Sequence, residues 1–133
     1  MANGEWGRGM TVRPINSYRD LEVWQVSMDL ASACYRHTRN YPKAELFGMT
    51  SQIRRSAASI AANIAEGHGR ENTGSFVQFL RIAQGSLKEL ETHLLLAQRV
   101  DIAPVRDAEP LIAQCESVGR MLRALIRSLQ ARQ

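Results

Sequence analysis

The chain has 133 residues and a net charge of +4, which fits one domain with a real core and is too small for two. Few prolines and aromatic residues, against many Ala, Leu, Ile and Arg, favour helices over sheets. No signal-peptide pattern or apolar run of transmembrane length is present, and Cys34 and Cys115 fall on predicted helix faces. We therefore expect a cytoplasmic protein with reduced thiols, no membrane association and, given its charge, compatibility with a nucleic-acid partner.

The first helix is predicted over residues 18–39, after a flexible arm at residues 1–16 that contains three glycines and a proline. Ser17 is suited to cap this helix. Its predicted core seam consists of Leu21, Trp24, Met28, Ala31 and Tyr35. A second apolar row consists of Val23, Ser27, Leu30 and Cys34. Because the two rows together exceed the width that one pair of neighbours covers, we expect this helix to be buried on two sides.

The second helix is predicted over residues 50–66, after a short helical turn near residues 43–48, with Thr50 or Ser51 as N-cap and Gly67 as a left-handed C-cap. One face is apolar and consists of Ile53, Ala57, Ile60 and Ile64. A second face consists of Ala58, Ala61, Ala62 and Ala65. The third face is polar and consists of Gln52, Arg55, Ser56, Ser59, Asn63 and Glu66. We interpret the polar face as half buried, with its hydroxyl and amide groups paired to neighbours; the alternative is a solvated face.

The third helix is predicted over residues 73–99, with Asn72 or Thr73 as its cap. Its apolar seam repeats at heptad spacing and consists of Phe76, Leu80, Ala83, Leu87, Leu90, Leu94 and Ala97. Gly85 interrupts this helix at a cost of roughly 1 kcal/mol relative to alanine, and either marks a close helix contact or is neutral.

The fourth helix is predicted over residues 107–130, after a turn in which Pro104 and Pro110 act as helix breakers. Its seam consists of Leu111, Cys115, Val118, Leu122, Leu125 and Leu129. Four long amphipathic segments with short connections predict an all-α fold, an antiparallel up-down-up-down four-helix bundle spanning residues 17–133. In this bundle Trp24, Ile60, Leu87 and Leu122 are expected to be almost fully buried.

Several motifs in residues 17–100 resemble those of the four-helix-bundle family of 23S rRNA intervening-sequence proteins. They are Asp20-Leu21-x-Val23-Trp24, Glu45-Leu46-Phe47-Gly48, Gln52-Ile53-Arg54-Arg55, Ser59-Ile60, Asn63-Ile64-Ala65-Glu66-Gly67, Arg70 and Phe79-Leu80-x-Ile82-Ala83-x-Gly85-Ser86-x-x-Glu89-Leu90-Glu91. The resemblance implies a small bacterial cytoplasmic bundle protein that assembles as a homopentamer and has no established enzymatic activity. It also implies kinship with the accessory variability proteins of diversity-generating retroelements, which bind RNA and a reverse transcriptase.

No pattern in the sequence predicts an enzyme, a cofactor or a metal site. Cys34 and His37 stand three residues apart on one helix, but no further pair of zinc ligands has a recognisable spacing. Glu66, Glu89 and Glu91 lack the Glu-x-x-His pattern of di-iron bundles. We expect these acids to pair with Arg54 or Arg55 across the bundle or between subunits.

Two hypotheses for function follow from the charge pattern. Arg120, Arg123 and Arg127 fall within about 60° of one another on the face opposite the seam of the fourth helix, which is either a solvated face or an RNA-binding surface. Further candidates for nucleic-acid binding are Arg54, Arg55, Arg70 and Arg81. Candidates for polar contacts within the bundle or the oligomer are Gln52, Ser59, Asn63, Glu66 and Glu89. The first hypothesis is an oligomeric RNA-binding scaffold; the second is an assembly module that binds protein partners and no nucleic acid.

Overall fold

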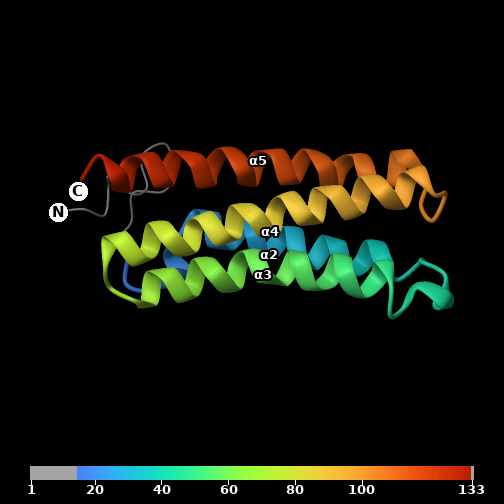
Figure 1. Cartoon of the computed structure of the whole chain (residues 1–133), viewed down its shortest axis with the longest axis horizontal. Helices are drawn as coiled ribbons and strands as arrows, with labels where there is room; N and C mark the ends of the chain where they lie inside the picture. The colour runs from blue at the N-terminus through green and yellow to red at the C-terminus, as the bar shows by residue number, and fades with distance from the viewer. Residues whose placement is uncertain (1–14, 133) are drawn as a thin grey trace.

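The computed structural model describes residues 15–132, which form a bundle of four long helices (Figure 1). The elements in chain order are η1 (Tyr18–Asp20), α2 (Glu22–Thr38), η2 (Lys43–Glu45), α3 (Met49–Gly69), α4 (Thr73–Arg99) and α5 (Val105–Gln130). Between residues 15 and 132 there is no β-strand, so the predicted all-α class is confirmed. None of the helices in this range is long and apolar enough to cross a membrane. The predicted arm lies almost wholly outside the described residues.

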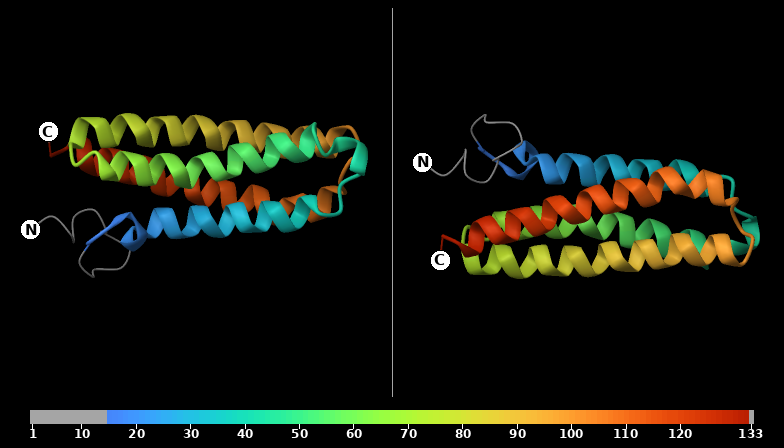
Figure 2. Two further views of the ribbon diagram at one scale, coloured as in Figure 1. Left: turned by 90° about the horizontal axis from the view of Figure 1, so that it is seen from below. Right: turned by 90° about the horizontal axis from the view of Figure 1, so that it is seen from above.

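Consecutive helices run in opposite directions and occupy neighbouring corners of the bundle. α3 contacts α2 and α4, and α5 contacts α4 and α2, so that α3 and α5 occupy opposite corners. The views in Figure 2 show that α2 begins at the end of the bundle where α5 finishes, with the α2–α3 and α4–α5 connections at the other end. The predicted up-down-up-down topology is therefore present.

The predicted seams of α3, α4 and α5 form the core. Ile53, Ile60 and Ile64 of α3 are fully buried, and every residue of the two predicted leucine-rich seams on α4 and α5 is buried as well. Leu87 and Leu122 are buried as predicted. These helices each carry one dominant apolar row, and that row packs against the neighbouring helices.

The predicted seam of α2 was wrong in part. The buried face of α2 consists of Val23, Ser27, Leu30, Ala31, Cys34 and Thr38. Trp24 is only half buried, and Met28 and Tyr35 keep 42% and 44% of their surface exposed. The row that contains Val23 and Leu30 points to the centre of the bundle, so the row with Trp24 and Met28 is rotated toward α3 and the surface. The expected burial of α2 on two sides is thus only partial.

The first helix is divided because Leu21 has an extended backbone (ψ 125°) between η1 and α2. Ser17 caps η1 as predicted: its Oγ accepts a hydrogen bond from Arg19 N–H (3.1 Å), and Asp20 Oδ2 accepts one from Ser17 N–H (3.2 Å). This reciprocal capping box stabilises the short 3-10 turn as a separate element.

Both predicted caps of α3 were wrong. The helix begins at Met49, whose N–H donates to Glu45 Oε1 (3.1 Å), so a residue outside the helix satisfies the first turn. At the other end the helix continues through Gly67 to Gly69. Gly67 is buried against α4, where an added Cβ would lie 2.6 Å from Phe79 Cβ. Its small size permits close helix packing, and the left-handed conformation occurs instead at Glu71 (φ 57°).

The bounds of α4 agree with the prediction, and Asn72 caps it by accepting from Ser75 N–H (2.9 Å). α5 begins two residues earlier than predicted, at Val105, and it continues through Pro110, so the prediction that Pro110 acts as a helix breaker is wrong. Proline removes one hydrogen-bond donor, which would have bonded to the carbonyl of Arg106. Because Arg106 and Pro110 are both exposed, water can take the place of the missing donor.

Candidate functional site

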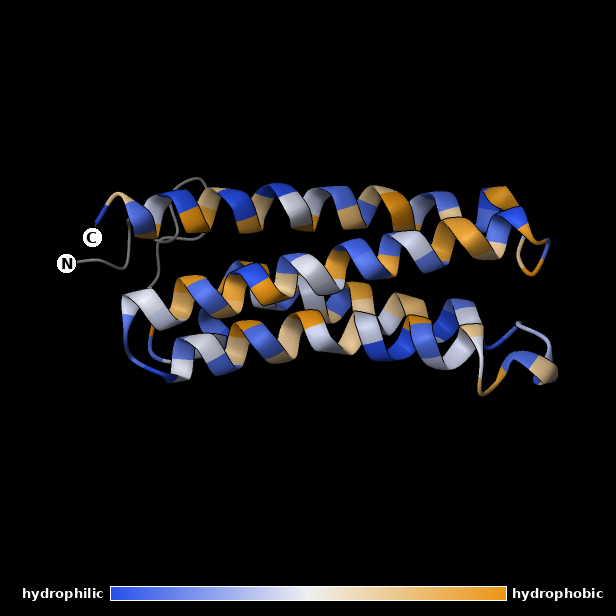
Figure 3. Cartoon of the chain, viewed as in Figure 1, coloured by the Kyte–Doolittle hydropathy of each residue, from blue (hydrophilic) through white to orange (hydrophobic). Residues whose placement is uncertain are grey.

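The predicted arginine stripe lies on the exposed side of α5. Arg120, Arg123 and Arg127 are all exposed, and none of them forms an ion pair within residues 15–132. In Figure 3 hydrophilic and hydrophobic segments alternate along α5, as expected of an amphipathic helix. The exposed row therefore presents three guanidinium groups to the surroundings, with exposed Glu116 at one end.

Arg81 of α4 extends this basic surface onto the neighbouring helix. A Cβ added at Gly119 of α5 would lie 3.4 Å from Leu87 Cδ2, which fixes the level at which the two antiparallel helices pack. Arg81 is exposed and precedes Leu87 by less than two turns, so it lies near the level of Arg123 and Arg127. We call Arg81, Arg120, Arg123 and Arg127 the arginine face.

Two other candidate arginines have structural partners. Arg54 Nε donates to Thr38 Oγ1 (2.9 Å), Arg54 Nη2 donates to the Tyr35 carbonyl (3.3 Å), and the guanidinium lies 4.7 Å from the centre of the Tyr35 ring. Arg70 pairs with Glu66 (2.9 Å) and lies 5.0 Å from the centre of the Phe79 ring. The contacts of Arg54 connect α3 to α2, and the contact of Arg70 with Phe79 connects the end of α3 to α4. Arg55 is exposed on α3, which occupies the corner opposite α5.

The predicted pairing of the acidic residues with Arg54 or Arg55 is wrong within the chain. Glu66 pairs with Arg70, one turn away, and Glu91 Oε1 accepts from Lys88 Nζ (3.1 Å). Glu89 is exposed and takes part in no ion pair among the described residues. Glu66 and Glu91 thus pair with basic residues one turn away on their own helices, whereas Arg54 bonds to Thr38 of α2.

The polar face of α3 is hydrogen bonded at the contact with α4. The Oγ atoms of Ser59 and Ser86 lie 2.8 Å apart, and Asn63 Nδ2 donates to the Ser59 carbonyl (2.8 Å) and to Ser59 Oγ (3.0 Å). Ser56 is buried and donates to the carbonyl of Gln52 (2.8 Å). Arg55 and Glu66 of the same predicted face are exposed. Two polar contacts predicted from the sequence, Ser59 and Asn63, are therefore made inside this chain.

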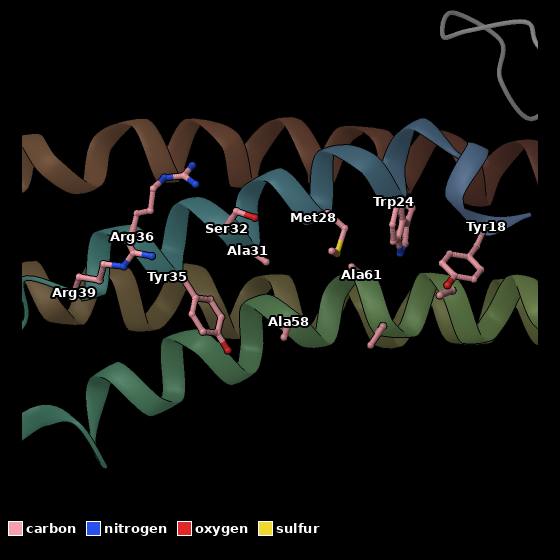
Figure 4. A pocket seen from close by; sticks show the side chains of 12 residues that line it. Tyr18, Trp24, Met28, Ala31, Ser32, Tyr35, Arg36, Arg39, Ala58 and Ala61 are labelled. Atoms are coloured by element: carbon pink, nitrogen blue, oxygen red, sulfur yellow. The ribbon is translucent and has the colours of Figure 1, made fainter.

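On its other side α3 leaves an open apolar groove against α2, with a volume of about 630 Å³ (Figure 4). Trp24, Met28 and Tyr35 point into it from α2, and Ala58, Ala61 and Ala62 line it from α3. Arg36 and Arg39 border the groove at the Tyr35 end. We call this surface the α2–α3 groove. Exposed apolar patches of this kind commonly mark contact sites.

Sequence reasoning missed this groove because it assigned Trp24, Met28 and Tyr35 to the core. The available signal was the second apolar row of the same helix, which gave α2 more apolar surface than one bundle covers. The alanines of α3 were a further signal, since small side chains leave space beside a larger residue unless another helix fills it.

The chemistry at Cys34 and His37 does not favour a metal site. Burial raises the pKa of the Cys34 thiol to about 12, so the thiolate that binds zinc is disfavoured. Burial also lowers the pKa of His37, which nearby Asp107 partly opposes, and His37 Nε2 lies 3.0 Å from Tyr41 Oη. Among residues 15–132 no group of three or more potential metal ligands comes together.

Comparison with known proteins gives a family but no activity. The family model of the 23S rRNA-intervening sequence protein matches residues 19–124. A crystal structure from Bacteroides thetaiotaomicron, described as a protein of unknown function from the S23 ribosomal protein family, superposes with a TM-score of 0.71 at 27% identity, covering 79% of this chain and 98% of that one. The comparison with curated proteins returns no match. The match over most of the chain shows that it belongs to the 23S rRNA intervening-sequence protein family.

Proposed function

We propose that this chain is a non-enzymatic, homo-oligomeric scaffold that binds RNA through its arginine face. The observation that supports this most directly is the exposure of four arginines on adjacent helices with no acidic partner among the described residues. Guanidinium groups in this state repel one another and attract phosphate groups. Because backbone phosphates are present at every nucleotide, such a surface binds RNA with little dependence on sequence.

Assembly strengthens this binding by repeating the arginine face. One face offers four cations, which is a weak site in physiological salt. Several copies on one particle let a single RNA strand engage neighbouring faces, and each further contact is intramolecular. The α2–α3 groove supports the assembly, because Met28 and Tyr35 expose apolar surface that a partner would cover.

A second candidate function is an assembly module that binds protein partners and no nucleic acid. The α2–α3 groove supports this alternative as well, since its apolar lining and basic border suit a protein helix. In that case the arginine face is only a solvated surface. The two candidates differ in what happens when the arginine face is neutralised.

The test is a triple variant, Arg120→Gln, Arg123→Gln and Arg127→Gln, titrated with a single-stranded RNA of mixed sequence. The matched control replaces Lys43, Arg99 and Arg106 with Gln, because these exposed residues carry the same charge at the opposite end of the bundle. We expect the first variant to lose at least tenfold in affinity and the control to lose much less. Equal affinities for both triple variants and the parent would refute the proposal and favour the protein-binding alternative.

A further inference from the structure

An exposed glycine in the middle of α4 has no role within the chain. A Cβ added at Gly85 would meet nothing within 4 Å, whereas one added at Gly67 would collide with Phe79. Glycine weakens a helix interior relative to alanine, so Gly85 lowers stability with no packing benefit inside this bundle. Ile82, one turn earlier, is 46% exposed, and Glu89, one turn later, has no ion pair among residues 15–132. We call Ile82, Gly85 and Glu89 the α4 notch.

The α4 notch and the α2–α3 groove have complementary chemistry. The groove offers apolar side chains in its middle and arginines at the end where Tyr35 lies, Arg36 and Arg39. The notch offers an isoleucine, a position without a side chain and then a carboxylate. A helix carrying the notch could approach Met28 closely at Gly85 and place Glu89 toward the arginines.

The two surfaces also lie at matching levels along the bundle. The contact between Ser59 and Ser86 places Gly85 at the level of residues 58–62 of α3, and Met28 lines the groove together with Ala58, Ala61 and Ala62. Glu89 lies about one turn beyond Ser86, toward the α2–α3 connection. Arg54 contacts Tyr35 in the same direction from Ser59, so Glu89 lies near the level of the Tyr35 end of the groove. A rotation about an axis parallel to the helices therefore suffices to bring groove and notch together, with no sliding between copies.

We propose that the α2–α3 groove of one copy receives the α4 notch of a second copy in a head-to-tail contact. The proposal rests on the assembly in the proposed function and is independent of RNA binding. Groove and notch belong to adjacent sides of a square bundle, so each repeated contact turns the next copy in the same direction and closes a small ring. In that ring α3 faces the axis, and α5, at the opposite corner, presents the arginine face outward.

The test mixes two single-cysteine variants, Met28→Cys and Gly85→Cys, under conditions that allow subunits to exchange, followed by mild oxidation. Both positions are exposed, so the fold tolerates the changes, and the native Cys34 and Cys115 are buried with pKa values of about 12. We expect disulfide-linked dimers in the mixture and none with either variant alone. The matched control replaces Gly85→Cys by Ala124→Cys, an exposed position on α5 at the corner opposite α3, and should not cross-link.

A charge reversal provides a second readout by light scattering. Glu89→Arg should raise the dissociation constant between copies about tenfold, and adding Arg36→Glu in the same chain should restore it. Dimers from Met28→Cys alone would show a two-fold contact and overturn the proposal. An oligomer with no cross-link in the mixture would overturn only this contact, whereas a monomer at micromolar concentration would refute the assembly in the proposed function as well.

Discussion

The two sides of α3 show how small residues produce opposite results in one helix. On the α4 side, Gly67 allows contact with Phe79, and the Ser59–Ser86 hydrogen bond connects the helices at 2.8 Å. On the α2 side, Ala58 and Ala62 line an open groove. On the α4 side, the small residues are packed and hydrogen bonded within the chain, whereas on the α2 side they leave apolar surface exposed. Small residues thus close a contact only where the opposing side chains fill the remaining space.

The largest expected effect is on α4, the helix that closes one side of α3. Leu87 is 1% exposed, so Leu87→Ala should lower the free energy of unfolding by roughly 2–5 kcal/mol. Met28→Ala on the open side is the comparison, and it should cost clearly less in the monomer because Met28 is 42% exposed. Urea unfolding at a concentration below that of assembly measures both. A cost below about 1 kcal/mol for Leu87→Ala would mean that the α4 seam is misplaced.

A smaller effect is expected at the close contact between α3 and α4. Gly67→Ala introduces a Cβ that would lie 2.6 Å from Phe79 Cβ, so it should destabilise the fold by about 1–3 kcal/mol. Gly69→Ala is the matched control, because a Cβ there meets nothing within 4 Å and alanine favours helix by up to about 1 kcal/mol. Thermal melts of both variants check this difference. A fully stable Gly67→Ala protein would contradict the close packing.

The fold could be predicted from the sequence where a helix carries one apolar row. In α4 and α5 the heptad rows face the centre of the bundle, and periodicity alone identifies them. α2 carries two rows, and periodicity does not say which one points inward. The prediction assigned the row of Trp24 and Met28 to the core, but the row of Val23 and Leu30 occupies it. The packing of α3 and α5 around α2 decides between them.

The candidate site could be predicted where residues act without a distant partner. Helical spacing suffices to place Arg120, Arg123 and Arg127 on one exposed row. By contrast, the sequence does not show that the candidate Arg54 has structural partners. Arg54 bonds to Thr38 and its guanidinium lies over the Tyr35 ring, and both residues belong to another helix that only the fold brings near. The role of Gly67 depends on the fold in the same way. Its sequence context predicts a C-cap, whereas its close contact with Phe79 of the next helix arises only in the tertiary structure.

The measurement that tests the central claim most directly is an RNA titration of the parent protein at two salt concentrations. If the arginine face holds backbone phosphates, binding releases counterions, and affinity should fall at least tenfold between about 50 and about 200 mM salt. The slope against salt should become shallower in the triple glutamine variant of Arg120, Arg123 and Arg127. An RNA affinity independent of salt, or no RNA binding even at low salt, would contradict the account.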